Sequence, residues 1–185
     1  TSLVAVILGA LALYFLIRRG EGGWTALLLA VLLIFTGMGS TAWHVTREQV
    51  ALTADTMPGM AYFAALLVFW IYYLGGRWLG ILPLAGIALL IYFLWPVSRE
   101  ALFIALGAFI VTLAGTLIAF TWRRRRPAFK LALATVGFAA LALALRSIDK
   151  SVCDIIPFGT HFFWHIFLAA AAYFGIRMMV KLREA

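Results

Sequence analysis

The sequence has few charged residues and almost no cysteine. Asp, Glu, Lys and Arg make up 12% of its 185 residues, and the single cysteine is Cys153. One cysteine excludes an internal disulfide. Hydrophobic residues make up 65% of the chain, well above the roughly 45–50% typical of a soluble domain. A chain of this composition cannot keep its apolar surface away from water by folding alone, so the sequence predicts an integral membrane protein that uses the lipid bilayer as its solvent.

Several common sequence signals are also absent. No secretory signal with a cleavage site precedes the first apolar run. The chain contains no glycine-rich phosphate loop between a strand and a helix, and no Gly-x-Ser-x-Gly nucleophile motif. No linker is long enough to separate two domains, and no internal repeat is evident. We therefore expect a single domain over residues 1–185, without the usual motif of a nucleotide-binding protein or a serine hydrolase.

What the chain does contain is a series of long apolar segments. A helix needs roughly 20 apolar residues to cross a bilayer, and glycine or proline marks most of the gaps between these segments. The pattern predicts an all-α, seven-transmembrane helix bundle. The expected helices cover residues 3–17, 24–44, 55–74, 78–95, 100–122, 128–146 and 159–180.

Positive charges are distributed unevenly between the two sides of this predicted bundle. Eleven Lys and Arg residues, including Arg123 to Arg126, fall on the side of the C-terminus, and four fall on the other side. Lysine and arginine are enriched in cytoplasmic loops, so we expect the N-terminus outside and the C-terminus in the cytoplasm. The net charge of +8 is then interpreted as a topology signal, and no nucleic-acid partner is expected.

Five polar residues are expected at one level of the membrane. Ser40 and His44 end the second apolar segment, four residues apart, and Asp55 opens the third. His161 and His165 are also four apart and begin the seventh, so each pair shares a helical face. In the predicted topology all five lie at the outer, extracytoplasmic level. Ionisable residues at membrane depth usually mark function.

Each of these residues also has a plain structural interpretation. The two histidines of the seventh helix could be a packing pair, and His44 an interfacial side chain. Asp55 could be a helix N-cap, where aspartate is favoured. Ser40 could join closely packed helices. The joint pattern favours a metal site, because the three histidines are all that the chain has and they share one level with a carboxylate and a hydroxyl.

Zinc is the metal that fits these residue types. Three neutral imidazoles leave one tetrahedral position open, which is typical of a catalytic zinc site. Water bound there has a pKa lowered toward about 7 and becomes a nucleophile. Asp55 could take its proton and pass it to a leaving amine, and Ser40 could orient the water or stabilise an oxyanion. The residues therefore predict a zinc-dependent hydrolase with His44, His161 and His165 as ligands.

Three segments of the chain resemble the alkaline ceramidases, part of a superfamily that includes the adiponectin- and progestin-type receptors. They are Gly37-x-Gly39-Ser40-x-x-x-His44, Leu52-x-x-Asp55-x-x-Pro58 and His161-Phe162-Phe163-Trp164-His165-Ile166. Trp164, which precedes the second of these histidines, resembles the pattern of the ceramidase branch more than that of the receptor branch. Ile148-Asp149-x-x-x-Cys153 resembles that branch more loosely.

The resemblance implies hydrolysis of the amide bond of ceramide or a related N-acyl lipid, a step in sphingolipid metabolism. It implies the same three zinc ligands, with Asp55 and Ser40 around the reacting water. The alternative is a receptor-like or membrane-perturbing, hemolysin III-like protein with a structural zinc. Cys153 is a further candidate ligand, and Asp149 and Asp154 are candidates for contact with a histidine.

Overall fold

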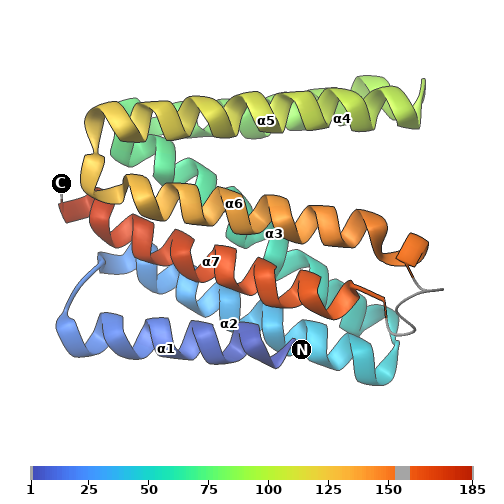
Figure 1. Ribbon diagram of the computed structural model, residues 1–185, viewed down its shortest axis with the longest axis horizontal. Coiled ribbons are helices and arrows are strands. Elements are labelled where there is room, and N and C mark those ends of the chain that lie inside the picture. The colour runs from blue at the N-terminus through green and yellow to red at the C-terminus, as the bar shows by residue number, and fades with distance from the viewer. Residues whose placement is uncertain (1, 153–158, 185) are drawn as a thin grey trace.

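The computed structural model describes residues 2–152 and 159–184, and these residues form an all-helical bundle (Figure 1). Its seven α-helices are α1 (Leu3–Arg19), α2 (Gly23–Thr46), α3 (Gln49–Ile71), α4 (Ile81–Leu94), α5 (Arg99–Arg124), α6 (Arg126–Ile148) and α7 (His161–Glu184). Short π and 3-10 segments, η1 (Tyr72–Gly76) and η2 (Arg77–Gly80), connect α3 to α4, and η3 (Asp149–Val152) follows α6. The predicted number of helices is confirmed for the described part of the chain.

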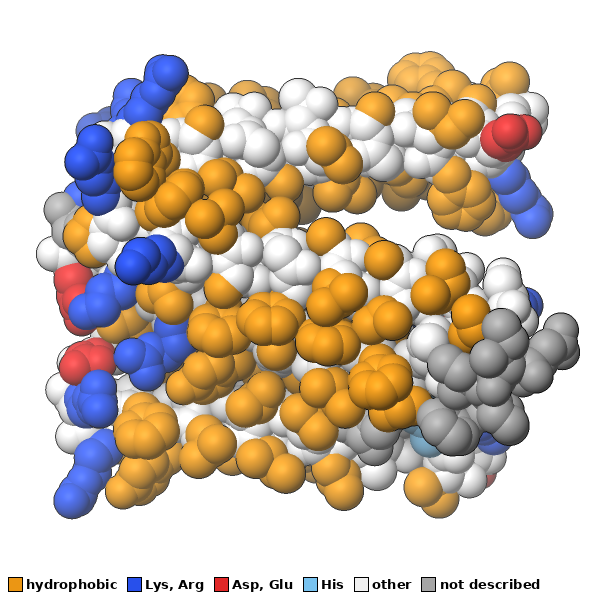
Figure 2. All heavy atoms as spheres, viewed as in Figure 1, with side chains coloured by type: hydrophobic (Ala, Val, Ile, Leu, Met, Phe, Trp, Pro, Cys, Tyr) orange, Lys and Arg blue, Asp and Glu red, His pale blue; other side chains and the backbone are white. Residues whose placement is uncertain are grey.

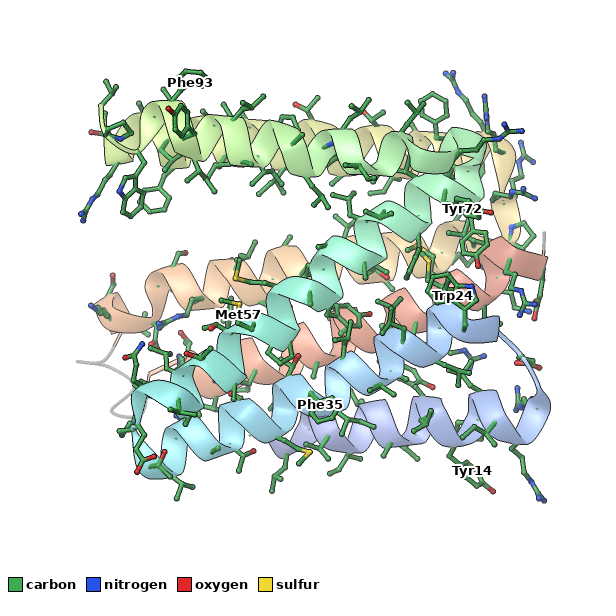
Figure 3. All side chains as sticks on the ribbon, turned by 180° about the vertical axis from the view of Figure 1, so that it is seen from behind. Tyr14, Trp24, Phe35, Met57, Tyr72 and Phe93 are labelled. Carbon is green, nitrogen blue, oxygen red and sulfur yellow. The ribbon has the colours of Figure 1, made fainter. Side chains whose placement is uncertain are left out.

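The outer surface of the bundle is apolar. Five segments that begin with α2, α3, α5, α6 and α7 are long and apolar enough to cross a membrane, and α4 is a shorter apolar helix. Tyr14 on α1, Phe35 on α2 and Phe93 on α4 are each more than half exposed (Figure 3). A water-facing surface rarely carries so many large apolar side chains. These features are typical of a multi-pass membrane protein.

Helix α7 lies at the centre of the bundle, where it contacts α1, α2, α3 and α6. Its buried residues include the small side chains Ala169, Ala172 and Gly175. A Cβ at Gly175 would lie 2.9 Å from the hydroxyl oxygen of Tyr62 on α3, and that hydroxyl donates a 2.6 Å hydrogen bond to the carbonyl of Ala172. Small residues let helix backbones approach closely, so α3 is held against the middle of α7.

Helices α2 and α3 approach even more closely at Gly39. A Cβ on this residue would collide with the backbone carbonyl of Ala54 and lie 2.7 Å from the amide nitrogen of Asp55. The contact therefore requires glycine, because any other residue would push the two backbones apart. It places the turn of α2 that carries Ser40 directly beside the turn of α3 that carries Asp55.

The expected start of the third helix was wrong. Helix α3 begins at Gln49, so Asp55 is its seventh residue and Pro58 lies inside the helix. The interpretation of Asp55 as an N-cap is excluded, because a cap precedes the first turn. Two threonines near this point, Thr53 and Thr56, donate hydrogen bonds to backbone carbonyls of α3 itself. Neither hydroxyl interrupts the helix.

Basic residues gather at the end of the bundle where α1, α5 and α7 terminate (Figure 2). Two hydrogen bonds tie α5 to α3 and η1 toward this end. Trp70 donates to the hydroxyl of Thr121 over 2.9 Å, and Arg124 donates to the carbonyl of Leu74 over 3.0 Å. None of the residues of α4, all of them described, is buried. The α4–α5 pair thus lies at the periphery, fastened at the basic end. The end of α2 and the start of α7, which carry the histidines, lie toward the opposite end (Figure 1).

Candidate metal centre

Three histidines from two helices meet at the end of the bundle opposite the one where most basic residues gather. His44 lies two residues before the end of α2, and His161 and His165 occupy the first two turns of α7. The Nε2 atom of His165 is 3.2 Å from Nε2 of His44 and 3.1 Å from Nε2 of His161. Among the described residues, these three form the group of His, Cys, Asp or Glu side chains whose donor atoms could hold a metal ion.

The spacing of the three nitrogens fits one small cation. A tetrahedral zinc ion about 2.0–2.1 Å from each nitrogen places its ligand nitrogens roughly 3.3 Å apart. A neutral imidazole carries one N–H and one bare nitrogen, so Nε2 of His165 cannot donate to both neighbours at once. A single cation satisfies all three lone pairs together. The donor set of three imidazoles is also one that suits zinc.

Ser40 and Asp55 lie in the same cavity as the histidines. The hydroxyl of Ser40 is buried and lies 3.0 Å from the hydroxyl of Ser2, which lines the same cavity. Asp55 is half-buried, and its side chain faces the same space. The structure therefore brings all five residues that the sequence singled out into one site. Asp55 arrives there from the second turn of α3 and not, as expected, from its first residue.

This cavity has a volume of about 460 Å³ and runs from the histidines along α3 and α7. Beyond the polar residues its walls are mainly aliphatic and aromatic side chains, which belong to α1, α2, α3 and α7. Those from α3 and α7 are Leu52, Met60, Tyr62, Phe63, Trp164, Leu168, Ala169 and Ala172. Ligand sites in proteins are usually clefts of this size and kind, with few polar groups at fixed places. The cavity suits an apolar molecule with one polar end near the histidines.

A second polar cluster lies at the junction of α6 and α7. The Asp149 carboxylate accepts a 2.7 Å hydrogen bond from the Thr160 amide, and its other oxygen lies 3.8 Å from Nδ1 of His161. Arg146 pairs with the same carboxylate at 3.2 Å and also lines the cavity. Thr160 donates from its hydroxyl to the carbonyl of Leu145 over 2.6 Å. The sequence had named Asp149 as a candidate for contact with a histidine, but gave no sign of Arg146.

Two residues that the sequence named as candidates for this site, Cys153 and Asp154, lie outside the described residues. Trp164 lines the cavity beside the histidines, which is compatible with packing against the site. Ser2 and Tyr62 line the cavity too, and the sequence analysis missed both. Their hydroxyls look ordinary in the sequence, because neither residue lies within the three motif segments.

A comparison with protein-family models places the chain in a known family. The model described as Ceramidase matches residues 1–185, the whole length of the chain. No curated protein matched the sequence closely. The family suggests a hydrolase that acts on ceramide, which agrees with the resemblance found in the histidine, serine and aspartate segments. With a match over its full length, the chain belongs to the Ceramidase family.

Proposed function

We propose that this protein is an intramembrane, zinc-dependent amidohydrolase that cleaves the amide bond of ceramide or a related N-acyl lipid. The observation that carries the proposal is the convergence of three histidine side chains at the polar end of an apolar cavity. Nε2 of His165 lies 3.2 Å from Nε2 of His44 and 3.1 Å from Nε2 of His161. Membership of the Ceramidase family supports the substrate class. The apolar outer surface supports a location in the bilayer, where such a lipid resides.

The residues of the site divide into metal ligands and reacting groups. His44, His161 and His165 would hold zinc through their Nε2 atoms. Zinc bound there supplies a water molecule of lowered pKa and polarises the amide carbonyl. The Asp55 carboxylate accepts the proton of the attacking water and then delivers it to the departing nitrogen. The Ser40 hydroxyl donates a hydrogen bond toward the oxygen on which negative charge develops.

The cavity walls determine where the lipid lies. An acyl chain packs against the apolar side chains of α3 and α7, among them Phe63 and Leu168. The amide group is then held at the polar end, beside the histidines. This arrangement makes the reacting bond the part of the lipid that meets the polar residues.

The proposal is tested with protein purified in detergent. Wild-type protein should bind about one zinc ion per chain and release fatty acid from ceramide, and His165→Ala should lose both properties. Zinc content is measured by elemental analysis and fatty acid by mass spectrometry. Wild-type protein that holds zinc fully, yet cleaves none of a broad panel of lipid amides, would contradict the proposal. That outcome would favour a receptor-like protein with a structural zinc.

A further inference from the structure

We infer that Asp149 is a positioning residue that holds the His161 imidazole with its proton on Nδ1 and its bare Nε2 toward His44 and His165. The inference rests on the proposed function, because orienting His161 matters for zinc binding. The orientation and the tautomer of the His161 side chain, however, exist with or without metal. Asp149 thus acts through His161 and does not itself touch a substrate.

The contacts of His161 carry the inference. Its Nε2 lies 3.1 Å from Nε2 of His165, so that nitrogen belongs to the cluster. Its Nδ1 faces the other way, toward Oδ2 of Asp149 at 3.8 Å. A negative carboxylate attracts the N–H end of the ring, and a small rotation brings the two atoms into hydrogen-bond range. A ring protonated on Nδ1 presents the lone pair of Nε2, which is the form that binds a metal.

The position of Asp149 is itself fixed from several directions. Its Oδ1 accepts the Thr160 amide at 2.7 Å, and Arg146 holds its Oδ2 at 3.2 Å. Gly159 has a φ of +62°, and a Cβ there would lie 2.5 Å from Oδ1. The glycine therefore both permits the backbone turn and leaves room for the carboxylate. The hydrogen bond from the Thr160 amide also fixes the backbone next to His161, because Thr160 is the residue before it.

The same cluster fastens α6 to the start of α7. Thr160 donates its hydroxyl to the carbonyl of Leu145, while its amide donates to Asp149. Carboxylates that accept the second N–H of a metal-binding histidine fix the ring orientation and raise the basicity of the ligand. Their loss typically lowers metal affinity about 10- to 100-fold. We expect Asp149 to have an effect of that size.

The experiment compares wild-type protein with Asp149→Asn in two measurements. The ¹⁵N spectrum of metal-free, histidine-labelled protein gives the tautomer, with His161 signals assigned by their loss in His161→Gln. Competition with a chromogenic chelator gives the zinc dissociation constant. Asp149→Asn should reduce the population protonated on Nδ1 and weaken zinc binding about 10- to 100-fold. The asparagine keeps an oxygen for the Thr160 amide, which limits the structural disturbance.

Two further variants separate positioning from general damage. Glu184→Gln removes another carboxylate–cation pair three residues apart, with Lys181 at the far end of α7, and should change neither measurement. Arg146→Gln removes a charge partner of Asp149 but leaves its carboxylate beside His161, so it should keep the tautomer and most of the affinity. Equal losses in Arg146→Gln and Asp149→Asn would overturn the inference, because the ion pair and not the histidine contact would then be responsible.

The outcomes also separate this inference from the proposed function. If wild-type protein takes up no zinc but its His161 tautomer responds to Asp149→Asn, the zinc hydrolase fails and the positioning role stands. If wild-type protein binds zinc and cleaves ceramide, while Asp149→Asn leaves tautomer and affinity unchanged, the positioning role fails and the hydrolase stands. Should Asp149→Asn not fold, Asp149→Glu serves in its place, and it should retain the Nδ1 proton with an intermediate zinc affinity.

Discussion

Asp55 is the residue whose chemistry separates a hydrolase from a structural metal site. It lies within α3, faces the cavity of the histidines, and is not among the three side chains whose nitrogens converge. Asp55→Asn keeps the shape of the side chain but removes its basicity. We expect ceramide cleavage to fall about 10²- to 10⁴-fold, with zinc content unchanged. Turnover is measured by fatty-acid release, and loss of zinc in this variant would instead make Asp55 a ligand.

Ser40 offers a second test at a single residue, with a matched control beside it. The hydroxyls of Ser40 and Ser2 lie 3.0 Å apart, so removing either one breaks the same hydrogen bond. If the Ser40 hydroxyl stabilises developing charge, Ser40→Ala should lower turnover about 10²- to 10³-fold. Ser2→Ala should lower it far less. Equal losses in the two variants would show that the hydrogen bond, and not the Ser40 hydroxyl, matters.

Helices α2 and α3 owe their spacing to Gly39. A methyl group at this position would collide with the carbonyl of Ala54, so Gly39→Ala should force the two helices apart. We expect a loss of about 1–3 kcal/mol in stability together with weaker zinc binding. The control is Gly107→Ala on α5, where a Cβ meets nothing within 4 Å. Thermal unfolding in detergent and zinc content measure both variants, and equal behaviour would contradict the close-contact argument.

At the level of whole helices, apolar length predicted the core of each helix better than its ends. Asp55 and Pro58 are residues typical of a helix start, so the prediction began the third helix at residue 55. In the structure α3 starts at Gln49, and Leu52 already donates its amide to the carbonyl of Glu48. Four of the six added residues are apolar, so apolar length alone would have allowed the earlier start.

The charge asymmetry predicts how the whole molecule is oriented in a membrane. Basic residues gather at one end of the bundle, and the histidines lie toward the other (Figure 2). We predict that the basic end is cytoplasmic. In a background without Cys153, Arg47→Cys should react with a membrane-impermeant maleimide on intact cells. Arg125→Cys should react only after permeabilisation, and the reverse pattern would contradict the prediction.

The candidate site as a whole was predictable because its residues are scarce. Three histidines in an apolar chain stand out, and the alternating direction of successive helices puts them at one level. The links between residues were predictable only in part. Asp149 was a candidate for contact with a histidine, but that the histidine is His161, and that Ser2 meets Ser40, depends on how helix ends pack in three dimensions. These partners are 12 and 38 residues apart in the sequence. At such separations the spacing along the chain does not determine the distance between two side chains.

The contact between Gly39 and Ala54 has a consequence for how this protein could diversify. It is a contact between backbones, so the relation of Ser40 to Asp55 does not depend on the size of neighbouring side chains. Met60, Phe63 and Leu168 line the cavity farther along. Exchanging them for smaller or larger residues should therefore alter the chain length that is accepted while the reacting groups stay in register. Substitutions in the cavity wall should thus change which lipids are accepted without changing how Ser40 and Asp55 are placed.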